Sequence, residues 1–220
     1  MLLIYNNIKK NPLIILSVFF LVSCVSTPTD NFNINQGISV VKIDEKLKDS
    51  IQLLNFKNSN GIIFPQEYAE KKFGNKQRYF TPNSEMIKET VLQLKNQYCI
   101  AIKNFRDYRK EQTLSDLKND TDKLKEALKY YIKQDKLLQK NCPKHQEKLD
   151  FSDKQFIGLY NEKGEKLILI QIINFKNDPY NLKPTCYSSW IDGWHGWFET
   201  NLQIMHYNLE TKKITVNDNI

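Results

Sequence analysis

Arginine is scarce in this chain. Only Arg78, Arg106 and Arg109 occur among 32 basic residues, so lysine supplies almost all of the positive charge behind the net value of +7. Arginine forks onto phosphates and stacks on bases, whereas lysine is a solvated point charge. The sequence also contains no basic stripe with interleaved aromatic side chains. The composition therefore argues against nucleic-acid binding and is compatible with a mild attraction to anionic lipid headgroups.

Catalytic signatures are also missing. The seven glycines form no phosphate-binding loop, and no paired-carboxylate motif is present. Ser188 and Ser189 lie in an expected loop without the glycines of a G-x-S-x-G elbow. The sequence consequently implies no cofactor.

Long apolar runs are absent too. Residues 12–22 form an apolar stretch of eleven residues that begins one residue after Lys9 and Lys10, and it is too short for a spanning helix of about 20 residues. The run ends in Leu21-Val22-Ser23-Cys24. This order resembles the signal peptide of a bacterial lipoprotein, with Cys24 at the lipid-bearing position. A membrane anchor or a core helix is the alternative interpretation, and it fits the flanking lysines and the polar tract poorly.

The lipoprotein resemblance sets the domain boundaries. We expect residues 1–23 to be removed as a signal peptide, 24–36 to form a lipidated polar tether, and 37–220 to form a single α+β domain. Cleavage leaves 197 of the 220 residues and lowers the charge from +7 to +5, because the leader carries two lysines and no acid. Val25, which is not aspartate, implies by the same resemblance an outer-membrane location. The tether has no acidic run just after Cys24, so we expect the domain to face the periplasm.

Three cysteines remain beside Cys24. An envelope compartment permits disulfides. With helices ending near residues 105 and 140, Cys99 and Cys142 would lie roughly 20 Å apart. We therefore expect a disulfide between Cys142 and Cys186, and a buried, inert thiol at Cys99.

Hydrophobic periodicity predicts an α+β fold, with two or three helices packed on one face of a small antiparallel sheet. Residues 47–54 carry apolar residues at helical spacing, and Thr81-Pro82 opens the clearest helix. The run KLILIQIIN is apolar on both faces, as in a central strand. The expected helices are 81–105 and 114–140, and the expected strands are 38–41, 156–159, 166–174, 198–206 and 214–216.

Several short motifs in residues 79–217 resemble a family of uncharacterised small secreted or lipid-anchored proteins of Gram-negative bacteria. The resemblance implies no catalytic or binding residue. The motif after Asp-Gly departs from the family at Trp194, and the end of the central strand lacks the family's cysteine. The motifs are Tyr79-Phe80-Thr81-Pro82, Lys154-Gln155-Phe156-Ile157-Gly158, Asn161-Glu162-Lys163-Gly164-Glu165-Lys166, Asp192-Gly193 with Trp197-Phe198, and Asn208-Leu209-Glu210-Thr211.

All three tryptophans occur within eight residues. Flat rings stack on sugars or planar ligands, and polar neighbours can orient such a ligand. The competing interpretation is a loop tucked under the sheet edge, with the rings in the core. The candidate ligand or partner contacts are Trp190, Asp192, Trp194, His195 and Trp197.

Two further sites are weighed on residue types alone. A metal site from Cys142, His145, Cys186 and His195 shows only one closely spaced ligand pair, whereas zinc sites usually show two. A nucleophilic set of Cys186, His195 and Asp192 has no local signature around the cysteine. We therefore expect a non-catalytic binding module for an envelope protein or small ligand, anchored through Cys24, without metal or nucleic acid. An envelope hydrolase that uses the Cys/His/Asp set is the alternative.

Overall fold

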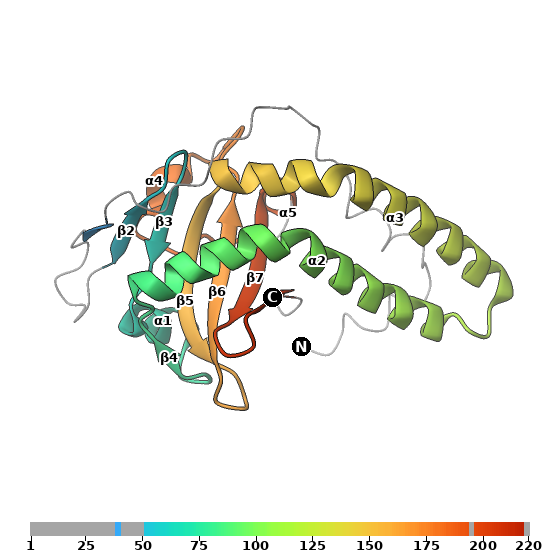
Figure 1. The fold of residues 1–220 in the computed structure, drawn as a ribbon, viewed down its shortest axis with the longest axis horizontal. Helices are drawn as coiled ribbons and strands as arrows, with labels where there is room; N and C mark the ends of the chain where they lie inside the picture. Colours follow the sequence, from blue (N-terminus) through green and yellow to red (C-terminus); the bar gives the residue numbers. More distant parts are fainter. Residues whose placement is uncertain (1–37, 41–50, 194–195, 218–220) are drawn as a thin grey trace.

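The computed structural model describes residues 38–40, 51–193 and 196–217, and these form an α+β fold (Figure 1). The predicted fold class is confirmed. In chain order, the elements are β1 (Ile38–Val40), β2 (Gln52–Asn55), β3 (Asn60–Ile63), α1 (Gln66–Phe73), β4 (Tyr79–Phe80), α2 (Ser84–Asp116), α3 (Thr121–Lys148), η3 (Leu149–Phe151), β5 (Asp153–Tyr160), β6 (Lys166–Ile173), α4 (Lys183–Cys186), α5 (Trp197–Asn201), β7 (Leu202–Asn208) and β8 (Lys213–Val216).

The strands form one sheet in the order β1-β2-β3-β5-β6-β7-β8, and β4 also pairs with β5. All pairings are antiparallel except that of β3 with β5. The predicted central strand is confirmed as β6, which pairs with β5 on one side and β7 on the other. A turn at residues 161–164 joins β5 to β6, and Gly164 supplies its positive φ of 81°.

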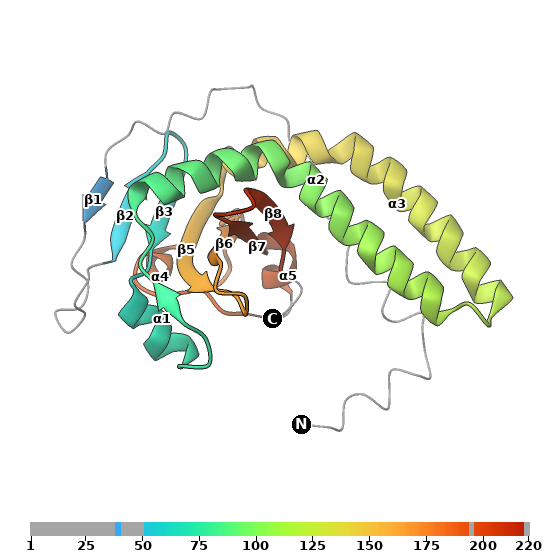
Figure 2. The same ribbon diagram turned by 60° about the horizontal axis from the view of Figure 1, so that its bottom comes forward.

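Alternate residues of the central strands enter two separate cores, because successive side chains of a strand point to opposite faces. Ile168, Ile170 and Ile172 of β6 pack under α2, in a cluster that we call the helix-side core. Leu167, Leu169 and Ile173 point the other way, into the connection-side core beside α1, α4 and α5. Figure 2 shows the two long helices on one side of the sheet and α1 on the other.

The helices α2 and α3 form an antiparallel hairpin whose distal half projects past the sheet (Figures 1 and 2). Near the start of α2, the apolar residues Ile87, Val91 and Leu94 recur at helical spacing and are buried against the sheet. The predicted ends were wrong, since α2 continues to Asp116 and α3 continues through Pro143 to Lys148. The charged stretch 106–112 contains no helix breaker, so it propagates the helix without an apolar stripe.

The extended hairpin also overturns the disulfide prediction. Cys99 and Cys142 form the disulfide, with Cα atoms 5.7 Å apart, and Cys186 is a free buried thiol. The helices turn at residues 117–120, rather than near residue 106, which brings the two cysteines to one level of the hairpin. The expected pair of Cys142 with Cys186, and the expected free thiol at Cys99, were wrong because both depended on helix ends placed too early.

Smaller corrections concern the edges of the elements. Residues 52–55 are strand β2 rather than part of a helix, and helix α1 was not foreseen. The expected strand 198–206 begins only at Leu202, because residues 197–201 form α5. Asn83 rather than Thr81 caps α2, and the Thr81 hydroxyl instead accepts the backbone N–H of Gln66 at the start of α1 (3.0 Å).

The predicted signal peptide and the whole of the predicted tether 24–36, with Cys24, lie outside the described residues. Among the residues that are described, no helix is long and apolar enough to cross a membrane.

Candidate functional site

The connection between β6 and β7, residues 174–201, contains every predicted ligand contact. It carries α4 and α5 and lies against the connection-side core. Short helices and irregular backbone cannot satisfy all of their own peptide groups, so the sheet beneath must supply hydrogen-bond partners.

Two buried glutamines supply those partners. The Gln155 amide donates to the carbonyls of Cys186 and Ser189, both at 2.7 Å, and its oxygen accepts the N–H of Ile191 at 3.0 Å. Gln171, opposite Gln155 on β6, donates to the Ile191 carbonyl at 2.9 Å. The Gln171 oxygen has no partner among the described residues, so the fixing of one backbone conformation rests on the Gln155 amide and on the side-chain N–H group of Gln171, which another arrangement would leave unpaired.

Trp190 lies in the connection-side core rather than on a binding surface. It is 5% exposed, and its ring meets Phe64 and Phe73 edge-on, with centroids 6.2 and 5.9 Å away. Its backbone N–H donates to the Tyr68 hydroxyl at 2.7 Å. For this residue, the structure favours the core interpretation over ligand contact.

Asp192 is exposed and forms an ion pair with Lys72 of α1 (2.5 Å). The hydrogen bond that Lys72 donates to the Asp192 carboxylate raises the pKa of the ammonium group, against the opposing effect of burial. Trp194 and His195 lie outside the described residues. At Gly193, a Cβ atom would come within 2.2 Å of the Phe198 ring, so only glycine allows this close approach.

Trp197 belongs to a group of four aromatic side chains that reaches the surface. Its ring stacks on Phe175 (6.1 Å between centroids) and meets Phe198 edge-on (5.4 Å). Phe198 in turn stacks on Tyr180 at 5.7 Å, and Tyr180 is 58% exposed. We call Phe175, Tyr180, Trp197 and Phe198 the aromatic cluster. It provides flat apolar area with part of that area in water, which is typical of a surface that receives rings.

The structure gives little support to Cys186 as a nucleophile. The side chain is fully buried, and burial raises the pKa of its thiol, with Asp153 adding to the effect. A reactive thiol needs access and thiolate character. The carboxylate that acts on Cys186 is therefore Asp153 rather than the predicted Asp192.

Asp153 was missed by sequence reasoning. It is 4% exposed, and its Oδ1 accepts the N–H of Asn60 at 2.7 Å. Its Oδ2 has no hydrogen-bond partner within the described residues, and Lys183 Nζ lies 4.0 Å away. The Asn60 amide also donates to the Tyr187 hydroxyl at 3.0 Å. These contacts join β3, β5 and the connection, and the sequence signal was a carboxylate at the start of an otherwise buried strand.

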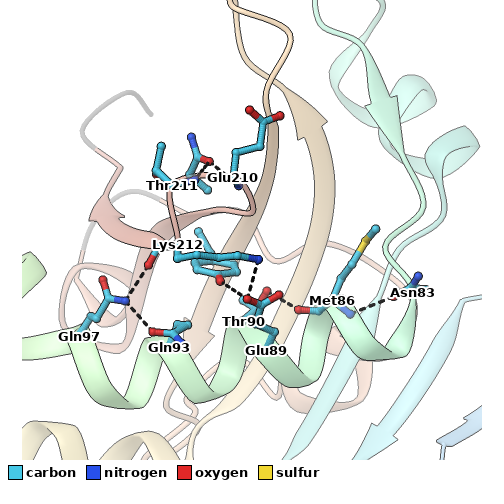
Figure 3. A network of polar contacts seen from close by, with 11 residues as sticks. Asn83, Met86, Glu89, Thr90, Gln93, Gln97, Glu210, Thr211 and Lys212 are labelled. Atoms are coloured by element: carbon cyan, nitrogen blue, oxygen red, sulfur yellow. Dashed lines mark hydrogen bonds and ion pairs between the residues drawn. The ribbon is translucent and has the colours of Figure 1, made fainter.

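A second polar network lies on the opposite face, between α2 and the β7–β8 turn (Figure 3). Glu89 accepts the Tyr207 hydroxyl at 2.9 Å and pairs with Lys212 at 2.7 Å. Gln97 donates to the carbonyl of Lys212 at 2.7 Å and to the side chain of Gln93 at the same distance. Burial and the Glu89 carboxylate raise the pKa of Tyr207, which keeps the phenol protonated as a donor. The network therefore fastens the helix to the sheet.

The metal site considered from the sequence, with Cys142, His145, Cys186 and His195 as ligands, lacks one of its thiolates in the structure. Cys142 is consumed by the disulfide with Cys99. Across the described part of the chain, no three His, Cys, Asp or Glu side chains gather closely enough to hold a metal ion.

Comparison of the chain with protein families, with curated proteins and with solved structures found no match. Function must therefore be argued from the residues of this chain.

Proposed function

We propose that this protein is a lipid-anchored envelope protein whose single domain binds an envelope partner or small ligand without catalysis. The observation that carries the proposal is the aromatic cluster, which is part-exposed and lies on a connection held by buried hydrogen bonds. The hydrolase alternative has no comparable support, because its thiol is buried.

The proposed anchor is Cys24, acylated after removal of residues 1–23. The outer membrane, with the domain in the periplasm, is the proposed location. The leader's order of lysines, apolar run and Leu21-Val22-Ser23-Cys24 supports this placement. The disulfide between Cys99 and Cys142 adds support, since such bonds persist in oxidising compartments. Several buried acyl chains would hold the protein stably, at about 0.8 kcal/mol per methylene.

The proposed contact surface is the exposed side of Tyr180 and Trp197. The Gln155 and Gln171 hydrogen bonds hold the connection before any ligand arrives. A surface that is already ordered loses little conformational entropy on binding. Partly exposed rings favour a partner that presents a flat face, either an aromatic side chain or the apolar face of a sugar.

A photo-crosslinking amino acid in place of Tyr180 tests this proposal in living cells. We expect a discrete covalent adduct after illumination, and loss of that adduct when Trp197→Ala is added. The matched control places the same amino acid at Tyr108, which is 53% exposed on α2. The same adducts from both positions, or none from Tyr180, would contradict the proposed surface. The mass of the adduct separates a protein partner from a sugar.

A further inference from the structure

Six lysines form a straight row along α3. They are spaced by four, four, three, four and four residues. This spacing places all of them on one stripe of a helix with 3.6 residues per turn, over a length of roughly 28 Å. All six are exposed, and they are Lys125, Lys129, Lys133, Lys136, Lys140 and Lys144. We call them the lysine row.

The fold directs the lysine row away from α2. The opposite side of α3 supplies the inter-helix contacts, which are the Cys142 disulfide, the Tyr131 hydroxyl on Thr113, and the Asp135 ion pair with Arg106. Because these contacts fix the rotation of α3 about its axis, the row faces outward along the hairpin.

The charges of the lysine row are not neutralised within the described parts of the chain. No ion pair involves any of the six side chains there. Between Lys129 and Lys144 the one acidic residue is Asp135, which pairs with Arg106 and Lys110 instead. The row is therefore a linear cationic surface whose ammonium groups are unpaired within the described residues, with Asp122, Glu126 and Glu147 as the acids near its two ends.

An exposed aliphatic side chain adjoins the row. Ile132 is 54% exposed and lies three residues after Lys129 and four before Lys136, so it neighbours both on the helix surface. Lysines beside an exposed aliphatic residue suit a lipid interface, where the ammonium groups meet headgroups and the aliphatic side chain meets the acyl boundary. A nucleic-acid surface would instead favour arginine and stacked aromatic rings.

We propose that the lysine row docks the hairpin on a bilayer surface rich in anionic phospholipid. The inference rests in part on the proposed anchor, which would hold the domain near a membrane. The 13 residues between Cys24 and Ile38 reach at most about 50 Å, so the domain stays within reach of the headgroups. The attraction is electrostatic and acts over about 8 Å at physiological ionic strength. It would orient the domain along the membrane.

Amine acylation followed by mass spectrometry tests the docking on the full chain. The protein is incorporated into vesicles of phosphatidylcholine alone, or of phosphatidylcholine with phosphatidylglycerol. We expect the lysine row to react at least about threefold more slowly in the anionic vesicles, and to recover at high salt. The exposed Lys71, Lys76 and Lys163 serve as references and keep their rates.

A charge-reversal variant and its matched control sharpen the test. Lys129→Glu with Lys133→Glu and Lys136→Glu removes the protection at Lys125, Lys140 and Lys144. The control makes the same charge change at Lys71, Lys76 and Lys163, and leaves the protection in place.

Two results would overturn the docking proposal. One is equal acylation of the row in both kinds of vesicle. The other is protection by duplex DNA or poly-glutamate in solution but not by anionic vesicles, which would assign the row to a soluble polyanion. Chain without acyl groups, mixed with preformed anionic vesicles, distinguishes failure of the docking from failure of the proposed anchor. If the docking is correct, the lysine row is still protected in this experiment, because the attraction is electrostatic and does not need the anchor. Failure of the proposed ligand surface, seen as absence of the Tyr180 adduct, would leave the acylation rates of the lysine row unchanged.

Discussion

The two faces of the sheet are covered by different means. On the helix side, two long helices bury an apolar stripe, and the Cys99–Cys142 disulfide joins them. On the connection side, short helices and irregular backbone are held by polar side chains that rise from the strands, chiefly Gln155 and Gln171. The first face is a stable support, while the second presents an ordered surface of irregular shape. Binding residues are commonly carried on loops that a rigid scaffold positions.

The largest expected effect separates the two tryptophans described on the connection. Trp190→Ala should lower the free energy of unfolding by about 3–5 kcal/mol, because it removes a buried ring from the connection-side core. Trp197→Ala should cost less, about 1–2 kcal/mol, since part of its ring lies in water. Denaturant unfolding measures both. Equal losses would show that the two rings do not differ in burial.

The next effect concerns the polar support of the connection. Gln155→Leu should destabilise the protein by about 2–4 kcal/mol, because two carbonyls and one N–H lose their partner. Gln139→Leu is the matched control at an exposed position of α3, and should change stability by less than about 0.5 kcal/mol. A folded, unaffected Gln155→Leu protein would contradict the role given to this side chain.

Loss of the disulfide should have an effect of similar size, confined to the helix side. The double change Cys99→Ser and Cys142→Ser opens a loop of 43 residues and should lower stability by about 2–4 kcal/mol. Thermal unfolding with and without reductant measures the loss. Cys186→Ser is the control, and the loss of stability that reductant causes should be the same in this variant as in the unaltered protein. A reductant effect that disappears with Cys186→Ser would contradict the observed pairing.

The smallest effects are expected in two different pH windows. Hydrogen bonding to Lys212 lowers the pKa of Glu89, so its contribution is present above pH 5 and lost as pH falls through the folded pKa. The pair is part-exposed and contributes a few tenths of a kcal/mol. Burial lowers the pKa of His206, so stability also falls below its ordinary pKa of 6.5 as the unfolded chain takes up the proton first. Stability curves of Glu89→Gln and His206→Gln should flatten in these separate windows, and flattening in one shared window would contradict the assignment.

The sequence predicted the parts of the fold that repeat. A run that is apolar on both faces identified the central strand β6, and helical spacing identified the packed face of α2. The helix ends were missed because 106–112 is polar yet helical, and the disulfide was missed with them. Which cysteines lie close together depends on where the helices end. The local error in the helix ends therefore caused the error in the predicted disulfide.

The candidate site was predicted less well for a physical reason. The Trp190–Trp197 segment was correctly singled out as dense in aromatic residues, but sequence alone could not separate the buried Trp190 from the part-exposed Trp197. The anchoring glutamines had a visible signal, since each interrupts an apolar strand. The backbone carbonyls that they bond lie more than 19 residues away along the chain, and no local sequence pattern reveals such a contact.

The most direct test of the account is the intact mass of the protein purified from native membranes, with thiols alkylated under denaturing, non-reducing conditions. The account predicts the mass of residues 24–220 plus acyl chains, one alkylated cysteine at Cys186, and a Cys99–Cys142 disulfide in the peptide map. A mass that retains residues 1–23, or a peptide map that joins Cys142 to Cys186, would contradict it.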